Sequence, residues 1–276
     1  MTTLKDDVFL LYTHPNGRFV INVYSREDME EVKEVIPLSG IVTEVQFMTS
    51  CNVSNCVYVG LCRKEGNRDY LAFEVSRIWK GVEHKFNVSP WINHSAYPCR
   101  MMTVSASGSL TALSYYRDDY NDSVVCAYNA DGSMQRRLWL PKDTNVYAYS
   151  NVIQKSNGNV VVAYICDSGY RQILLELDTS GNVVRQFQSS VEVVGDWFAS
   201  LADNYDRMIV GDVRKGFEML DSEFNLLRVY SLQKGQGKQL SLVHLHYDCH
   251  RNEIVRIHCD KRTYTNVLTI FRLTEE

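Results

Sequence analysis

The feature of this sequence that most constrains its fold is a repeat of roughly fifty residues. Six short apolar segments begin at residues 19, 70, 123, 172, 217 and 266, so successive starts lie 45 to 53 residues apart. Further short runs rich in β-branched and aromatic residues surround each segment and predict antiparallel strands. Repeats of this length that form four-stranded meanders are typical of propeller blades. The sequence therefore predicts an all-β fold, a six-bladed β-propeller of four-stranded antiparallel blades.

The clearest repeat covers residues 197–230, with strands predicted at 197–201, 208–210, 217–220 and 226–230. We name the four strands of a repeat a, b, c and d in chain order. A single meander does not bury both of its faces, so each repeat needs neighbours. We expect one domain over residues 1–276, with blades over approximately 7–38, 42–89, 97–141, 145–190, 195–232 and 240–276.

The two ends of the chain predict how the ring closes. In the first repeat, strand b is predicted at 8–12 with no a strand before it, and the last repeat ends without a d strand. We therefore expect a ring closed by the two termini. Closure removes the sheet edges that otherwise favour aggregation.

Composition narrows the class of protein. Hydrophobic residues make up 45% of the 276 residues, which excludes disorder as the main state. A net charge of −4 argues against indiscriminate binding of polyanions. The first residues lack the apolar core of a signal peptide, and no apolar run is long enough to span a bilayer. Several of the eight scattered cysteines fall in predicted strands, which favours reduced thiols. We expect a cytoplasmic protein that has no membrane partner.

One segment resembles a known repeat. Residues 209–230, IVGDVRKGFEMLDSEFNLLRVY, resemble an NHL repeat, and weaker copies occupy 160–187 and 8–24. The order of elements is similar to that of the C-terminal propellers of animal tripartite-motif NHL (TRIM-NHL) proteins. The chain departs from that family because it has no cysteine and histidine ladder with zinc-binding spacing and no coiled-coil heptads. The resemblance therefore implies a module that binds RNA or protein on one rim face, without ligase activity.

Antiparallel alternation sorts the charged residues between the two ends of each blade. The b–c and d–a connections emerge together at one end, which we call the basic face. The a–b and c–d connections emerge at the other end, which we call the acidic face. The acidic face collects carboxylates, among them Asp131, Asp178, Asp206, Asp221, Glu223 and Glu253. The candidate binding residues of the basic face are Arg63, Lys64, Trp91, Tyr97, Arg117, Tyr170, Arg171, Arg214, Lys215, Lys261 and Arg262.

This pattern leads to three interpretations of the basic face. The first is a non-catalytic interaction module that binds a protein partner, with aromatic anchors among cationic side chains. The second is a single-stranded RNA-binding propeller that uses the same face, because cations suit phosphates and flat rings suit bases. The third is a plain solvated rim, in which the aspartates of the c–d connections serve turn chemistry. We expect no cofactor, and a monomer when the domain is isolated.

A histidine-rich strand provides an alternative of another class. His244, His246, Asp248 and His250 alternate, so in a strand they share one face. Such a strand at a channel mouth would suit the metal of a propeller hydrolase or lactonase. Residues two apart on a strand are separated by about 7 Å, which is too far to chelate one ion together. No Gly-x-Ser-x-Gly nucleophile motif occurs. We therefore expect a structural strand, no metal, no catalytic residues and no enzyme activity.

Overall fold

The computed structural model describes residues 2–14, 17–38, 42–64, 71–79, 82–87, 101–105, 108–115, 123–141, 144, 151–166, 170–193, 197–201, 205–212, 216–231, 240–248, 253–260 and 265–272. These residues form antiparallel strands arranged in six sheets, five of four strands and one of three. None of them forms a helix that could cross a membrane. The chain divides into two compact units, Met1–Ala148 and Tyr149–Glu276.

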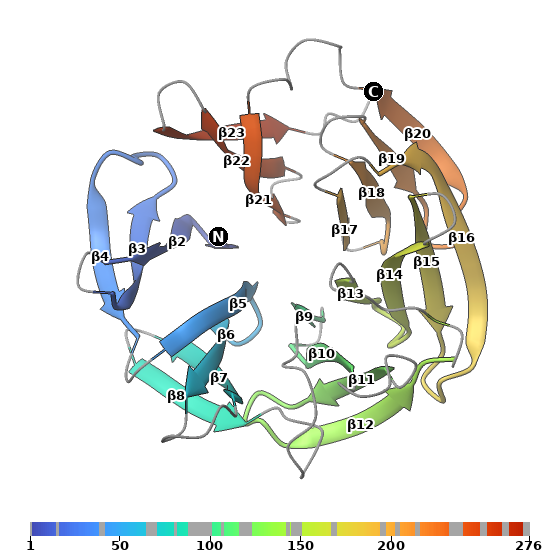
Figure 1. Cartoon of the computed structure of the whole chain (residues 1–276), viewed down its shortest axis with the longest axis horizontal. Helices are drawn as coiled ribbons and strands as arrows, with labels where there is room; N and C mark the ends of the chain where they lie inside the picture. Colours follow the sequence, from blue (N-terminus) through green and yellow to red (C-terminus); the bar gives the residue numbers. More distant parts are fainter. Residues whose placement is uncertain are drawn as a thin grey trace. The chain divides into compact units, whose positions relative to one another are not determined.

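The first unit contains three meanders in which each strand pairs with the next one along the chain (Figure 1). The innermost strands of successive sheets lie against each other, β1 against β5 and β5 against β9. The strands are β1 (Thr2–Leu4), β2 (Asp7–Thr13), β3 (Phe19–Ser25) and β4 (Val32–Pro37); β5 (Val42–Cys51), β6 (Cys56–Lys64), β7 (Leu71–Trp79) and β8 (Val82–Asn87); and β9 (Met101–Val104), β10 (Leu110–Tyr115), β11 (Ser123–Tyr128) and β12 (Met134–Trp139).

The second unit repeats this plan. The innermost strand β13 lies against β17, and β17 lies against β21. The outermost strand β16 also contacts β18 and β19 of the next sheet. The strands are β13 (Asn151–Gln154), β14 (Val160–Cys166), β15 (Arg171–Leu177) and β16 (Val183–Glu192); β17 (Trp197–Leu201), β18 (Met208–Asp212), β19 (Gly216–Leu220) and β20 (Leu226–Ser231); and β21 (Leu240–Asp248), β22 (Glu253–Asp260) and β23 (Thr265–Arg272).

The first sheet corrects one prediction made from the sequence. β1 pairs with β2 and supplies the innermost strand of its own sheet, where no a strand was expected. Lys5, in the turn between them, adopts a left-handed backbone with φ of 55°. Three residues with a single apolar side chain, Thr2–Leu4, are too short for hydrophobic alternation to reveal a strand. The remaining predicted strands are confirmed, with ends shifted by a few residues.

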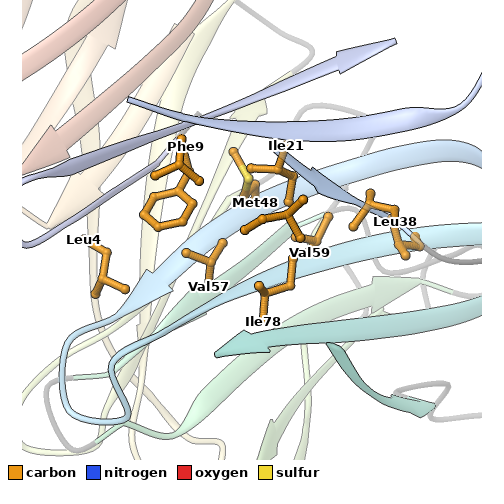
Figure 2. Close-up of a cluster of buried hydrophobic side chains, with 11 residues drawn as sticks. Leu4, Phe9, Ile21, Leu38, Met48, Val57, Val59 and Ile78 are labelled. Carbon is orange, nitrogen blue, oxygen red and sulfur yellow. The ribbon is translucent and has the colours of Figure 1, made fainter. Parts of the chain in front are cut away.

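Apolar side chains between neighbouring sheets form the cores. In the first unit, Phe9 and Ile21 of one sheet meet Met48, Val57 and Val59 of the next (Figure 2). In the second unit, a cluster of the same kind joins the sheet that begins with β13 to the sheet that begins with β17. Burial of about 25 cal/mol per Å² of apolar surface drives this packing. The β5–β8 sheet is covered on both faces in this way, because a second cluster packs Cys51, Cys56 and Tyr58 against the β9–β12 sheet.

Candidate functional site

The candidate binding residues whose side chains are described lie in the second unit, at the connection between β14 and β15. Tyr170 comes directly before β15, and its side chain is 68% exposed. Arg171, the first residue of β15, is exposed as well. Two consecutive residues, one aromatic and one cationic, are therefore both exposed to solvent.

The backbone beneath this pair is well defined. Tyr170 has a left-handed φ of 50°, which is uncommon for a residue other than glycine. The N–H of Val193 donates a hydrogen bond of 2.6 Å to the carbonyl of Tyr170, and Arg171 pairs in register with Glu192 of β16. Left-handed residues cost roughly 1 kcal/mol and persist where surrounding contacts impose them, often at binding sites. The Tyr170 ring thus projects from a backbone that β16 fixes.

The other predicted binding residues are placed less completely. Arg63 and Lys64, which were expected in a b–c connection, are the last two residues of β6 and pair with Ala72 and Leu71 of β7. Trp91, Tyr97, Arg117, Arg214, Lys215, Lys261 and Arg262 lie outside the described residues, so their place in the binding face remains a prediction. Of the candidate residues, Tyr170 and Arg171 are the two whose side chains are described, and they are neighbours in the sequence.

Three aspartates of the acidic face serve turn chemistry. Asp178 Oδ1 accepts hydrogen bonds from the backbone N–H groups of Ser180, at 2.8 Å, and Asn182, at 2.9 Å. Asp221 makes the same contacts with Glu223 and Asn225, both at 2.8 Å. Asp131 likewise caps its turn by accepting from Ser133. These carboxylates organise their own turns, the role expected of aspartates in c–d connections.

Two further residues assigned to the acidic face are buried. Asp206 accepts hydrogen bonds from the N–H of Ser156, at 2.8 Å, and from its hydroxyl, at 2.6 Å. Glu253, at the start of β22, is also buried. Neither carboxylate adds an exposed charge to the acidic face, and Asp206 is instead bound to Ser156 of the preceding sheet.

The turn aspartates predict how stability responds to acid. Hydrogen bonds from the side chain and backbone of Asn182 lower the pKa of Asp178 from its usual value. A lowered pKa in the folded state contributes stability at pH values above the unfolded pKa of about 3.9 and loses it as the pH falls toward the folded value. We expect Asp178→Asn, which keeps an acceptor oxygen, to flatten the fall in unfolding free energy between about pH 5 and 2. Urea titrations at each pH measure this, with Glu223→Gln as control. Parallel profiles for wild type and Asp178→Asn would contradict the prediction.

A buried ionic cluster joins two sheets of the second unit, and sequence reasoning missed it. Lys155 Nζ lies 3.0 Å from Glu176 Oε2, and their side chains are 3% and 1% exposed. Arg185 Nε lies 3.1 Å from the same oxygen. Lys155 also donates to the carbonyl of Ser222, at 2.5 Å, and lies over the ring of Phe224. Lys155 and Glu176 belong to the sheet of β13–β16, whereas Ser222 and Phe224 lie in the turn between β19 and β20. The cluster therefore fastens this turn to the preceding sheet.

A second buried carboxylate has the same function. Glu218 of β19 is fully buried and accepts hydrogen bonds from the hydroxyl of Ser189, at 2.6 Å, and from the N–H of Ser190, at 3.2 Å. The hydroxyl of Ser190 donates to it as well. Both serines belong to β16, the outermost strand of the preceding sheet. In the sequence, both this contact and the Glu176 cluster are indicated only by a glutamate that interrupts an apolar strand.

Tyr205 is an exposed aromatic residue that sequence reasoning did not select. Its side chain is 77% exposed, and the guanidinium of Arg207 lies 6.0 Å from the centre of its ring. It sits in the a–b connection before β18, beside the Asp206–Ser156 contact that joins two a–b connections. Tyr205 and Tyr170 therefore emerge at opposite ends of the sheets.

The histidine strand is present at the predicted place in the order of strands. His244, His246 and Asp248 lie at alternate positions of β21, which is the first strand of its sheet. They pair in register with Ile257, Val255 and Glu253, and a register shift precedes His244. His250 lies outside the described residues. In the part of the chain whose side chains are described, no group of three or more histidine, cysteine or acidic residues is arranged to hold a metal.

The comparisons with known proteins support the fold. No protein-family model matches the chain, and no curated protein matches it. A protein of unknown function from Bacteroides caccae is similar with a TM-score of 0.59 and 13% identity, over 87% of this chain and 78% of that chain. A protein of unknown function from Dyadobacter fermentans is similar with a TM-score of 0.60 and 12% identity, over 93% of this chain and 88% of that chain.

A third solved structure is a quinoprotein alcohol dehydrogenase-like protein from Bacteroides thetaiotaomicron. Its TM-score is 0.50 at 11% identity, over 96% of this chain and 63% of that chain, so the present chain spans less than two thirds of it. Identities this low carry the fold and not the activity. The chain has an all-β propeller fold built from antiparallel sheets. The NHL resemblance depends on the quoted sequence segments alone.

Proposed function

We propose that this propeller is a non-catalytic interaction module that binds an acidic protein partner through its basic face. The observation that carries the proposal is Tyr170, a residue that is 68% exposed and whose carbonyl accepts a hydrogen bond from the N–H of Val193. Tyrosine and arginine are the residue types most enriched at binding hot spots. A ring on a backbone that is already ordered loses little entropy when it is covered. Tyr170 and Arg171 therefore supply an anchor and a cation for one partner surface.

The proposal includes the finer architecture. We take the six described sheets as six blades of one NHL-like ring over residues 1–276, closed between the two ends of the chain. The regular spacing of the c strands supports this arrangement, as does the strand order within each sheet. In such a ring the b–c and d–a connections of all blades share one end. The remaining candidates, from Arg63 to Arg262, would then surround Tyr170 and Arg171.

Single-stranded RNA is the second candidate ligand for the same face. An exposed ring beside a guanidinium group suits a base stacked next to a phosphate. The two ligands differ in how salt affects binding, because RNA binding releases condensed counterions and weakens steeply with ionic strength. A propeller hydrolase with metal at His244, His246 and Asp248 is the remaining alternative, and metal analysis of the purified protein tests it.

The binding proposal predicts a large effect of Tyr170→Ala. Acidic peptides selected from a displayed library against the whole chain serve as the protein-like probe, and a random single-stranded RNA pool serves as the other. We expect Tyr170→Ala to weaken peptide binding by about thirtyfold, the loss typical of a hot-spot residue. Arg171→Glu should weaken it further by adding a repulsive charge. Fluorescence polarisation at two salt concentrations measures both effects.

Tyr205→Ala is the matched control, because it removes an exposed tyrosine from the opposite end of the sheets. It should leave peptide binding unchanged. Peptides that bind Tyr170→Ala as tightly as wild type, or that require Tyr205, would overturn the assignment of the basic face. Tight RNA binding that is lost in Arg171→Glu and in an Arg214→Glu/Lys215→Glu variant would replace the protein partner with RNA.

A further inference from the structure

Two cysteines oppose each other at the end of the hairpin formed by β5 and β6. Cys51 is the last residue of β5, Cys56 is the first residue of β6, and the two are register partners across a turn over 52–55. Opposed residues in an antiparallel pair have Cα atoms about 4.5 or 5.5 Å apart, depending on the type of pair. A disulfide accepts Cα separations of about 4.4–6.8 Å. The backbone of this hairpin is therefore already in the range that a disulfide requires.

The two sulfur atoms interact in the reduced state. Both residues are reduced and 1% exposed. The N–H of Ser54 donates a hydrogen bond to Cys51 Sγ at 3.3 Å, and Cys56 lies opposite Cys51 as its register partner. Hydrogen bonding to Cys56 and to the N–H groups of the turn lowers the pKa of Cys51 to about 6, although burial raises it. The lowered pKa favours the thiolate of Cys51 at neutral pH.

Cys126 of the same core cluster shows what an ordinary buried cysteine looks like here. It packs with Cys51 and Cys56 in one apolar cluster of the first unit. Its register partners are Ala112 and Arg137, so no cysteine opposes it, and burial raises the pKa of its thiol. Burial in this cluster therefore does not by itself lower the pKa of a thiol. The opposed register and the turn N–H distinguish Cys51.

We propose that Cys51 and Cys56 form a reversible redox pair that a small hydroperoxide oxidises to a cross-strand disulfide. The thiolate of Cys51 attacks one oxygen of hydrogen peroxide, the O–O bond breaks, and the departing hydroxide takes a proton to become water. The sulfur of Cys56 then attacks the sulfenic sulfur of Cys51, loses its proton, and releases the second water. Both sulfur atoms are oxidised by one electron each, and the peroxide is reduced by two electrons.

Burial selects the oxidant. Each thiol is covered, so a disulfide as large as oxidised glutathione lacks a path to the sulfur atoms, whereas hydrogen peroxide is close to water in size. The turn also packs on the neighbouring β9–β10 turn, where a Cβ atom placed on Gly108 would lie 3.3 Å from Val53 Cβ and 3.5 Å from Cys51 Sγ. A disulfide formed here would tie together the two ends of a hairpin that supports the adjacent sheet.

The test uses the full chain, reduced and then treated with one equivalent of hydrogen peroxide. After unfolding and alkylation, peptide mapping by mass spectrometry should show a Cys51–Cys56 cross-link and the loss of two alkylatable thiols, both restored by dithiothreitol. Cys56→Ser should stop at a sulfenic acid on Cys51, which dimedone traps when it is present as the chain is unfolded. Cys51→Ser should form no such acid, and Cys126→Ser should behave as wild type.

If the variants fold poorly, the peptide map of the oxidised wild-type chain tests the proposal by itself. A cross-link from Cys51 to any other cysteine would overturn the proposal, as would an unmodified pair after other thiols in the chain have reacted. Oxidised glutathione that produces the cross-link as fast as peroxide would overturn the assigned class of oxidant.

Discussion

Replacing Glu176 by alanine is expected to lower the free energy of unfolding by about 3–5 kcal/mol. The substitution leaves the Lys155 ammonium, which is 3% exposed, without the carboxylate that lies 3.0 Å away. An uncompensated charge in a core costs several kcal/mol, more than the attraction that the intact pair provides. Arg185 and Asn159 lose the same partner. Urea denaturation followed by circular dichroism measures the change as a lower midpoint.

Two further variants separate charge from shape. Glu176→Gln keeps an oxygen that can accept from Lys155, so we expect a smaller loss than for alanine. The double variant Lys155→Met/Glu176→Leu removes both charges and retains volume, which in other proteins is neutral or stabilising. It should therefore recover most of the stability lost in Glu176→Ala. A loss of less than about 1 kcal/mol in Glu176→Ala would show that Lys155 reaches water, which contradicts the buried cluster.

The short apolar runs and their repeat were sufficient to predict an all-β propeller of antiparallel sheets. Short β-branched runs separated by turns predicted every strand except β1, whose three residues carry too little pattern. The buried carboxylates were visible in the sequence in one respect only. Glu176 and Glu218 interrupt apolar strands, which is unusual for a charged residue without a partner. Their partners, such as Lys155 and Ser189, lie on neighbouring elements that strand periodicity does not connect.

The candidate sites differ in how far the pattern of apolar and polar residues along the chain predicts them. Tyr170 and Arg171 were selected from the sequence because connections between strands usually lie at the surface. The opposition of Cys51 and Cys56 was not, because it depends on the length of β5 and β6. The apolar runs that mark these strands in the sequence cover only 45–48 and 57–61, whereas β5 spans Val42–Cys51 and β6 spans Cys56–Lys64. Only the longer strands place the two thiols in register, and strand ends are what periodicity determines least well.

Replacing Gly211 by alanine is the second large expected effect, with a loss of about 3 kcal/mol or more. Gly211 lies in β18, between its register partners Phe198 and Phe217. A Cβ atom at this position would lie 2.3 Å from the carbonyl oxygen of Gly216 and 2.6 Å from the Cα of Phe217. Carbon atoms in contact are ordinarily about 3.5–4.0 Å apart. Both obstacles are backbone atoms, so the added methyl group forces β18 away from β19 instead of turning a side chain aside.

Gly17→Ala is the matched control for this substitution. Gly17 has a left-handed φ of 80°, but a Cβ atom there meets nothing within 4 Å. Its replacement therefore costs only the backbone strain of roughly 1–2 kcal/mol. The difference between the two variants in urea denaturation isolates the collision between β18 and β19. If Gly211→Ala proved no more destabilising than Gly17→Ala, the close approach of these two strands would be wrong, and the register that buries Glu218 against Ser189 would have to be revised with it.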